Sequence, residues 1–286
     1  MSFSIRRTSA PLGAIVTGLE PKGLSRGEAA DLQRAFLEHG VLVFKGLDLD
    51  DEGQVELARV FGEPQPTRLP RFHLADQPLV MELSSKSEAA APDYDPDPDA
   101  IVGMLRWHSD SSYTETPHRG TLLRAIVVPE VGGDTGWVDR TEVYRSLPYG
   151  LKCKLQGLRI VHSYAHTGRT SENLPDVSQP LVYAHPETDQ PVLNISPSMA
   201  LRIDGLPKDE AAELLASLIA MVTDETRAYR HHWEAGDVLV WDNWRTVHRA
   251  YGHPQKYPRV MRRTALRSDM RLGRWLEGAA ALGQVA

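Results

Sequence analysis

Two strand-like segments that lie far apart in the sequence, each leading into a histidine, constrain the fold of this chain most. Trp107 and His108 precede residues 109–113 in a pattern typical of a strand that runs into a loop. The apolar run at 237–243 predicts a buried strand, and His248 follows it closely. Side chains two positions apart on an extended strand point to the same side, so we expect His108 and Asp110 to face one common point.

These residue types, in this order, indicate a metal site. Two imidazoles and one carboxylate bind one face of an Fe(II) ion and leave the opposite face free for a chelating cosubstrate and O2. An H-x-D triplet is common by chance, and the chain has 11 histidines. The order and the surrounding sequence therefore carry the prediction, rather than any single residue. The candidate metal ligands, which are also the candidate catalytic residues, are His108, Asp110 and His248.

Arginines that follow the second histidine offer partners for organic anions. We predict a further strand at 257–264, on which Arg259 and Arg263 share one face and Arg262 takes the other. Arg259 and Arg263 are therefore expected to face the site, and Arg262 to point away from it. A planar guanidinium binds a carboxylate or a sulfonate through two parallel hydrogen bonds, which a lysine cannot do.

The whole set of motifs resembles the taurine dioxygenase and 2,4-dichlorophenoxyacetate dioxygenase family of Fe(II)/2-oxoglutarate-dependent enzymes. The resemblance extends over nearly the whole chain. The segments that carry it are residues 13–18, 40–44, 107–113, 129–135, 180–182, 185–188, 236–243, 248 and 258–264.

The resemblance implies a role for each candidate residue. His108, Asp110 and His248 match the iron ligands. Thr135 and Arg259 match the residues that bind the distal carboxylate of the cosubstrate 2-oxoglutarate, and Arg263 matches the arginine that binds the anionic group of the primary substrate. The implied reaction uses O2, converts 2-oxoglutarate to succinate and CO2, and hydroxylates the substrate. Hydroxylation beside a heteroatom would then cleave a sulfonate, a sulfate ester or an aryl ether.

The resemblance also implies the fold, with weaker support from the sequence pattern. We expect one domain over 1–286, mainly β with flanking helices, built as a double-stranded β-helix (jelly roll). A capping box at Ser25 and Glu28 predicts a helix that ends near residue 39. Further patterns predict a strand at 41–44 and helices at 51–61 and 208–222. The helices near 25–39 and 208–222 are expected to cover one sheet.

One departure from the family concerns the primary substrate. Where the taurine enzyme has a histidine that contacts the sulfonate, this chain has Thr67, with Arg68, Arg71 and His73 nearby. Taurine is therefore disfavoured, although Arg263 still favours a small anionic organic substrate. Two kinds of reaction remain open, namely cleavage of an anionic xenobiotic or sulfonate, and hydroxylation of a biosynthetic carboxylic or amino acid.

Two other classes of protein also remain open. A metal-binding jelly roll can be a zinc isomerase or hydrolase, but that interpretation leaves Arg259 and Thr135 without a role. A non-catalytic sensor of 2-oxoglutarate would use the same contacts for binding alone. Succinate production that the substrate stimulates separates both from an oxygenase.

Composition agrees with a single globular enzyme. The 286 residues are 41% hydrophobic, which is enough for one sizeable core. The net charge of −6 gives no support for binding nucleic acid, and we predict neither a signal peptide nor a membrane span. The lone Cys153, expected to be a packed and inert thiol, suits a reducing cytoplasm. We also expect a homo-oligomer, and a mobile lid around 85–105.

Overall fold

The computed structural model describes residues 3–66, 72–85, 97–167 and 174–276. Thr67, Arg68 and Arg71 lie outside these ranges, as does most of the segment predicted as a lid. The last residues of that segment, 101–105, belong to a strand. The lid therefore stays a prediction.

The larger sheet has the strand order β1-β2-β3-β15-β7-β17-β4, with β5 paired to β17 as well. Neighbouring strands run antiparallel, except that β2 and β3 are parallel. The strand predicted at 257–264 is present but begins and ends slightly later in the chain. The bounds are β1 Ser4–Arg7, β2 Ala14–Thr17, β3 Val41–Phe44, β4 Pro64–Gln65, β5 Met81–Ser84, β7 Gly120–Val127, β15 Val238–Asp242 and β17 Val260–Leu266.

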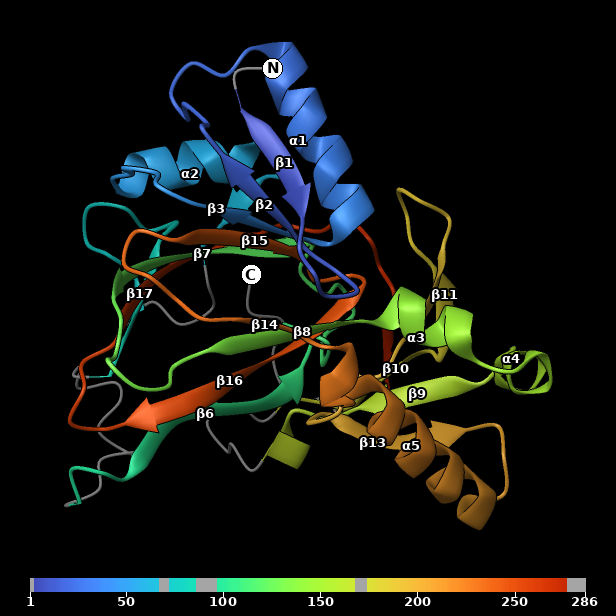
Figure 1. Ribbon diagram of the computed structural model, residues 1–286. Coiled ribbons are helices and arrows are strands. Elements are labelled where there is room, and N and C mark those ends of the chain that lie inside the picture. The colour runs from blue at the N-terminus through green and yellow to red at the C-terminus, as the bar shows by residue number, and fades with distance from the viewer. Residues whose placement is uncertain (1–2, 67–71, 86–96, 168–173, 277–286) are drawn as a thin grey trace.

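A smaller sheet faces the larger one, as Figure 1 shows, and has the order β14-β8-β16-β6. Trp137 and Trp233 pack from its side against an apolar cluster that includes Leu123, Trp241 and Met261 of the larger sheet. The space between the two sheets is therefore a hydrophobic core for much of its extent. The bounds are β6 Ile101–His108, β8 Thr135–Asp139, β14 Tyr229–His231 and β16 Thr246–Pro254.

The apolar run in β15 is continuous because both faces of this strand are covered. Leu239 and Trp241 point between the sheets, whereas Val238 and Val240 pack on the opposite side. Side chains alternate between the two faces of a strand, so a strand that is buried on both faces needs apolar residues at every position.

Two helices, α1 Arg26–His39 and α2 Asp51–Arg59, cover the outer face of the larger sheet (Figure 1). The predicted capping box begins α1, since the Glu28 backbone N–H donates to Ser25 Oγ and the Ser25 N–H donates to Glu28 Oε2. Gly40, at φ 70°, ends the helix in the left-handed conformation that glycine adopts at low cost.

The remaining helices pack at the other end of the molecule, beside a side sheet with the order β13-β9-β10-β18. Helix α5 is confirmed as predicted, but it contacts β13 and α3, whereas α1 packs on β3 and β15. The prediction that these two helices cover one sheet was therefore wrong. The bounds are α3 Arg140–Ser146, α4 Tyr149–Leu155, α5 Lys208–Val222, β9 Arg159–His162, β10 Val177–Pro180, β13 Ala200–Asp204 and β18 Arg274–Trp275, with a hairpin of β11 Val182–Ala184 and β12 Pro191–Leu193 and short 3-10 turns at Ala165–Thr167 and Glu225–Arg227.

Two further expectations concern the surface. Cys153 is exposed on α4, so the prediction of a packed thiol was wrong. Leu155 takes the buried position on α4 instead. Within the residues that the structure describes, we find no helical segment with the length and apolar character needed for a membrane crossing.

Candidate metal centre

The two predicted histidine ligands lie side by side on neighbouring strands of the smaller sheet. His108 is the last residue of β6, and His248 lies in β16 directly opposite it in the strand register. Their ring centroids are 4.2 Å apart. Residues far apart in the sequence therefore meet because β6 and β16 pair.

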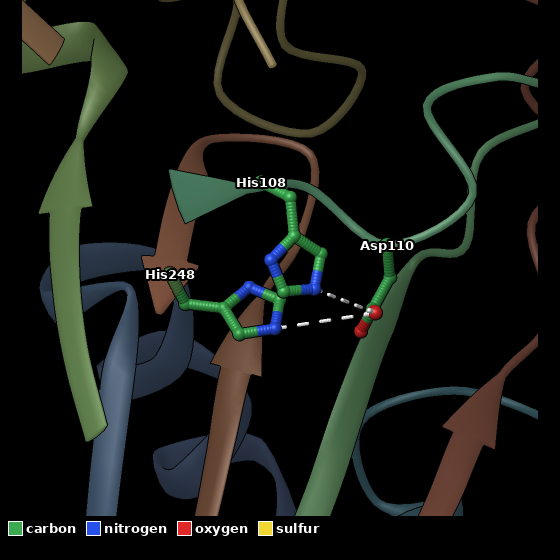
Figure 2. A group of neighbouring side chains, drawn as sticks. All are labelled: His108, Asp110 and His248. Atoms are coloured by element: carbon green, nitrogen blue, oxygen red, sulfur yellow. Dashed lines mark ion pairs between the residues drawn. The ribbon is translucent and has the colours of Figure 1, made fainter. Parts of the chain in front are cut away.

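Asp110 approaches the histidines from the turn that follows β6. Its Oδ1 atom lies 3.8 Å from His108 Nε2 and 4.0 Å from His248 Nε2, the two contacts drawn in Figure 2. The predicted proximity is correct, but its predicted cause was wrong, because the strand ends at His108 and Asp110 does not share its extended geometry. The turn itself brings the carboxylate back toward the rings.

Several contacts hold this turn in place. The Ser109 hydroxyl donates to the Thr246 carbonyl at 2.6 Å, and the Ser109 N–H donates to Ser196 Oγ at 3.0 Å. Ser111 has φ 55°, a left-handed conformation that a serine adopts only when its surroundings impose it. The direction of the Asp110 side chain is thus fixed by long-range contacts.

The donor atoms fit a divalent metal ion. His108 Nδ1 donates a hydrogen bond to the Arg106 carbonyl at 2.8 Å, which fixes the tautomer and leaves the lone pair on Nε2. Asp110 Oδ2 accepts hydrogen bonds from Thr121 and Arg263, both at 2.9 Å, so Oδ1 is the oxygen turned toward the rings. One ligand atom from each of His108, Asp110 and His248 lies within 4.8 Å of the others.

Electrostatics favour the protonation states that bind metal. Burial alone would raise the pKa of Asp110, but the charge of Arg263, with the two histidines, outweighs it and holds that pKa far below its ordinary value. Burial and the neighbouring His108 ring lower the pKa of His248 to about 3. At neutral pH the site therefore presents one carboxylate and a neutral His248 imidazole, the forms in which these groups ligate metal.

The predicted faces of β17 are correct for two of its arginines. Arg263 points between the sheets and pairs with Asp110, and it also donates to Thr121 Oγ1 at 3.2 Å. Arg262 points to the outer side, where its guanidinium pairs with Glu82 at 2.9 Å. The sequence predicted Arg263 at the site but did not predict its ion pair with a candidate metal ligand.

Arg259 precedes β17 and has a different environment. Its backbone N–H donates to Ser85 Oγ, and its Nε lies beside Gly133, where an added Cβ would meet it at 3.5 Å. Burial lowers the pKa of Arg259 to about 10, with no carboxylate raising it again. Among the described residues we find no anionic partner for its guanidinium. A partly buried cation in this state offers a binding point for an anion.

Thr135 lies on the same face of the smaller sheet as His248. It is two positions from Trp137 in β8, and Trp137 pairs with His248 in the strand register. Its Oγ1 accepts a hydrogen bond from Trp233 Nε1 at 3.0 Å. That bond uses a lone pair, so the hydroxyl proton of Thr135 remains for donation.

Comparison with known proteins agrees with this geometry. Residues 5–265 match the family described as "Taurine catabolism dioxygenase TauD, TfdA family". The chain belongs to this family. It is 35% identical, over 84% of its length and 86% of the relative, to the alpha-ketoglutarate-dependent 2,4-dichlorophenoxyacetate dioxygenase of Burkholderia sp. (strain RASC).

Two further comparisons extend the likeness. The chain is 31% identical to the (S)-phenoxypropionate/alpha-ketoglutarate-dioxygenase of Sphingobium herbicidovorans, over 94% of this chain and 96% of the relative. A crystal structure of a taurine dioxygenase from Burkholderia xenovorans superimposes with a TM-score of 0.80 at 30% identity and covers 98% of both chains. The family predicted from the sequence is confirmed, and so is the mainly β architecture with few helices.

Sequence reasoning missed two residues that bind Asp110 itself in this TauD, TfdA family member. Thr121 is the second residue of β7 and binds Asp110 Oδ2. Asn243 lies in the turn between β15 and β16 and binds the Asp110 backbone. Asn243 ends the 236–243 segment that carries the family resemblance, but the sequence predicted no role of its own for it.

Proposed function

We propose that this protein is an Fe(II)- and 2-oxoglutarate-dependent dioxygenase that hydroxylates a small anionic organic substrate. The observation that carries the proposal is the convergence of His108, Asp110 and His248, with Asp110 Oδ1 turned toward the two imidazoles. Two imidazoles and a carboxylate on one face of the ion leave room for a chelating cosubstrate. Family membership supports the same reaction class.

We assign the iron to His108, Asp110 and His248, and the distal carboxylate of 2-oxoglutarate to Arg259 and Thr135. The partly buried charge of Arg259, with no anionic partner among the described residues, supports this assignment. The Thr135 hydroxyl, whose oxygen already accepts from Trp233, supplies a second donor for the same carboxylate.

The reaction takes up one O2 and splits 2-oxoglutarate into succinate and CO2. One oxygen atom enters succinate, and the other enters a C–H bond of the substrate to give an alcohol. When bound, Fe(II) supplies the activation of O2. The chain's own residues hold the cosubstrate at Arg259 and Thr135 and orient the substrate through Arg263, because positioning decides which carbon is attacked.

The substrate class follows from Arg263 and from the relatives. Arg263 is the guanidinium beside the candidate iron site and suits a carboxylate or sulfonate. The relatives with at least 31% identity named above act on phenoxyalkanoates, so we propose an aryloxyalkanoate first. Sulfonates, sulfate esters and a biosynthetic carboxylic or amino acid follow as alternatives, and taurine remains disfavoured.

Three finer properties belong to the same proposal. We assign the two facing sheets to a double-stranded β-helix, which their opposed arrangement supports. A cytoplasmic location and a homo-oligomeric state stay predictions. Light scattering coupled to size-exclusion chromatography would measure the mass of the oligomer directly.

An anaerobic visible spectrum tests the function. Purified protein with Fe(II) and 2-oxoglutarate should give a metal-to-ligand charge-transfer band, and the matching substrate class should shift it. Succinate should then form with O2 only when that substrate is present. Bound iron without a band would contradict chelation and favour a hydrolase or isomerase. A band with no succinate for any substrate class would favour a non-catalytic sensor.

A further inference from the structure

A single buried amide side chain holds both backbone polar groups of Asp110. Asn243 Oδ1 accepts from the Asp110 N–H at 2.8 Å, and Asn243 Nδ2 donates to the Asp110 carbonyl at 3.0 Å. Nδ2 also donates to the His118 carbonyl at 2.9 Å, at the far end of the same loop. The residue is only 1% exposed. All three side-chain hydrogen bonds of Asn243 are therefore made to the backbone of the loop that carries Asp110.

Asn243 is itself held firmly. Its backbone N–H donates to the Arg119 carbonyl at 3.2 Å, and its carbonyl accepts from Arg140 Nη2 at 3.1 Å. Arg140 is 2% exposed and also donates to the Trp244 carbonyl at 2.7 Å. A fully buried guanidinium that binds two successive carbonyls leaves the turn between β15 and β16 little freedom.

The position of this turn matters because it leads directly into the strand of the second histidine. β16 begins at Thr246, two residues before His248. Asn243 thus joins the loop that carries the carboxylate to the turn that precedes one imidazole. The Ser109–Thr246 hydrogen bond joins the same two segments one residue before Asp110.

We infer that Asn243 is a positioning residue for the metal centre, setting the place of the Asp110 carboxylate relative to His248. The inference rests on the proposed function, since it assumes that these residues bind the metal. Without the amide, the loop loses two contacts at Asp110, and the left-handed Ser111 loses part of the surroundings that impose its conformation. The carboxylate would then spend less time at the position that closes the ligand triangle.

Residues that orient metal ligands without touching the metal typically change metal affinity 10- to 100-fold when they are replaced. We expect Asn243→Ala to weaken Mn²⁺ binding by about that factor. Asn243→Ser is the second variant, because its hydroxyl is too short to reach both Asp110 groups and yet keeps the site polar. If Asn243→Ala does not fold, Asn243→Ser carries the test.

Gln54 provides a matched control. It is fully buried on α2 and has the same set of three side-chain hydrogen bonds, accepting from Arg124 and donating to the Arg262 carbonyl and to Thr264 Oγ1. It contacts none of the three candidate ligands. Gln54→Ala should therefore lower the melting temperature in the same way as Asn243→Ala but leave Mn²⁺ affinity within about twofold of wild type.

The experiment is isothermal titration of each folded protein with Mn²⁺, with thermal unfolding of the metal-free protein alongside. The anaerobic Fe(II)/2-oxoglutarate band provides a spectroscopic readout, and we expect it to be weaker or shifted in the Asn243 variants. Wild-type Mn²⁺ affinity in both Asn243 variants would overturn the inference, as would an equal loss of affinity in Gln54→Ala. Unchanged Mn²⁺ binding in His108→Ala would instead overturn the metal site and the proposed function itself.

Discussion

Arg259 allows a prediction whose size follows from the structure. Burial lowers the pKa of this guanidinium from its ordinary value to about 10. At about 1.4 kcal/mol per pKa unit, keeping the charge in this position costs about 3 kcal/mol. A bound carboxylate recovers that cost, and about 3 kcal/mol corresponds to roughly a 100-fold change in a dissociation constant.

Arg259→Met should therefore raise the dissociation constant of 2-oxoglutarate by roughly 100-fold. The same substitution should leave the stability of the ligand-free protein unchanged or slightly raised, because it removes a partly buried charge that has no anionic partner among the described residues. If Arg259 instead stabilised the fold, its replacement would lower the stability of the ligand-free protein and leave 2-oxoglutarate affinity unchanged. Measuring both the affinity and the stability therefore identifies an arginine that binds an anion.

The assay is titration of the Mn²⁺-loaded protein with 2-oxoglutarate, with chemical denaturation of the ligand-free protein. Arg262→Met is the matched control, because this neighbouring arginine points outward and pairs with Glu82. The control should keep wild-type 2-oxoglutarate affinity and lose at most about 1 kcal/mol of stability. If the dissociation constant of 2-oxoglutarate in Arg259→Met stays within threefold of the wild-type value, Arg259 does not bind its carboxylate.

Three further predictions concern other parts of the molecule. Replacing His108, Asp110 or His248 with alanine should abolish substrate-dependent succinate production, and full activity in any of the three variants would contradict the metal assignment. Arg263→Gln should raise the KM of the primary substrate far more than that of 2-oxoglutarate, and should also weaken Mn²⁺ binding because Asp110 Oδ2 loses its ion pair. The pKa of His162 is lowered to about 3, first by burial and then by Arg140. The unfolded chain, with an ordinary pKa near 6.5, therefore takes up this proton first, and stability falls as pH decreases from about 6.5 toward 3. His162→Asn should flatten that part of the stability profile, as measured by denaturant unfolding at several pH values, and an unchanged slope would show that His162 is not responsible.

Local sequence patterns predicted the parts of this fold that local physics determines. The helix at Lys208–Val222 follows from the spacing of Leu214, Leu215 and Leu218, and the start of α1 follows from one capping box. Helix α2 was predicted at 51–61, and it ends at Arg59 with Val60 as its capping residue. These features depend on neighbours within one or two turns of the chain.

The candidate site likewise has a part that the sequence predicted and a part that only the structure shows. Residue types and order were enough to select His108, Asp110 and His248, but not to explain how they meet. Asp110 reaches the histidines through a turn whose contacts come from Thr246 and Asn243, more than a hundred residues away. No spacing rule reports such contacts, because they depend on how β15 and β16 are placed against the loop after β6.

The placement of Asp110 has a consequence for the mechanics of the molecule. Its Oδ1 faces histidines on β6 and β16 of the smaller sheet, while its Oδ2 binds Thr121 on β7 and Arg263 on β17 of the larger one. His108, Asp110 and His248 would hold a metal ion here, and because Asp110 also pairs with Arg263, that ion would link the two layers in a removable way. At a free metal concentration of 100 times its dissociation constant, the ion adds about 2.7 kcal/mol to stability. That stabilisation would act where the two layers meet, so removal of the metal should speed amide hydrogen exchange at the end of β6, where no strand within the described residues pairs with the outer side.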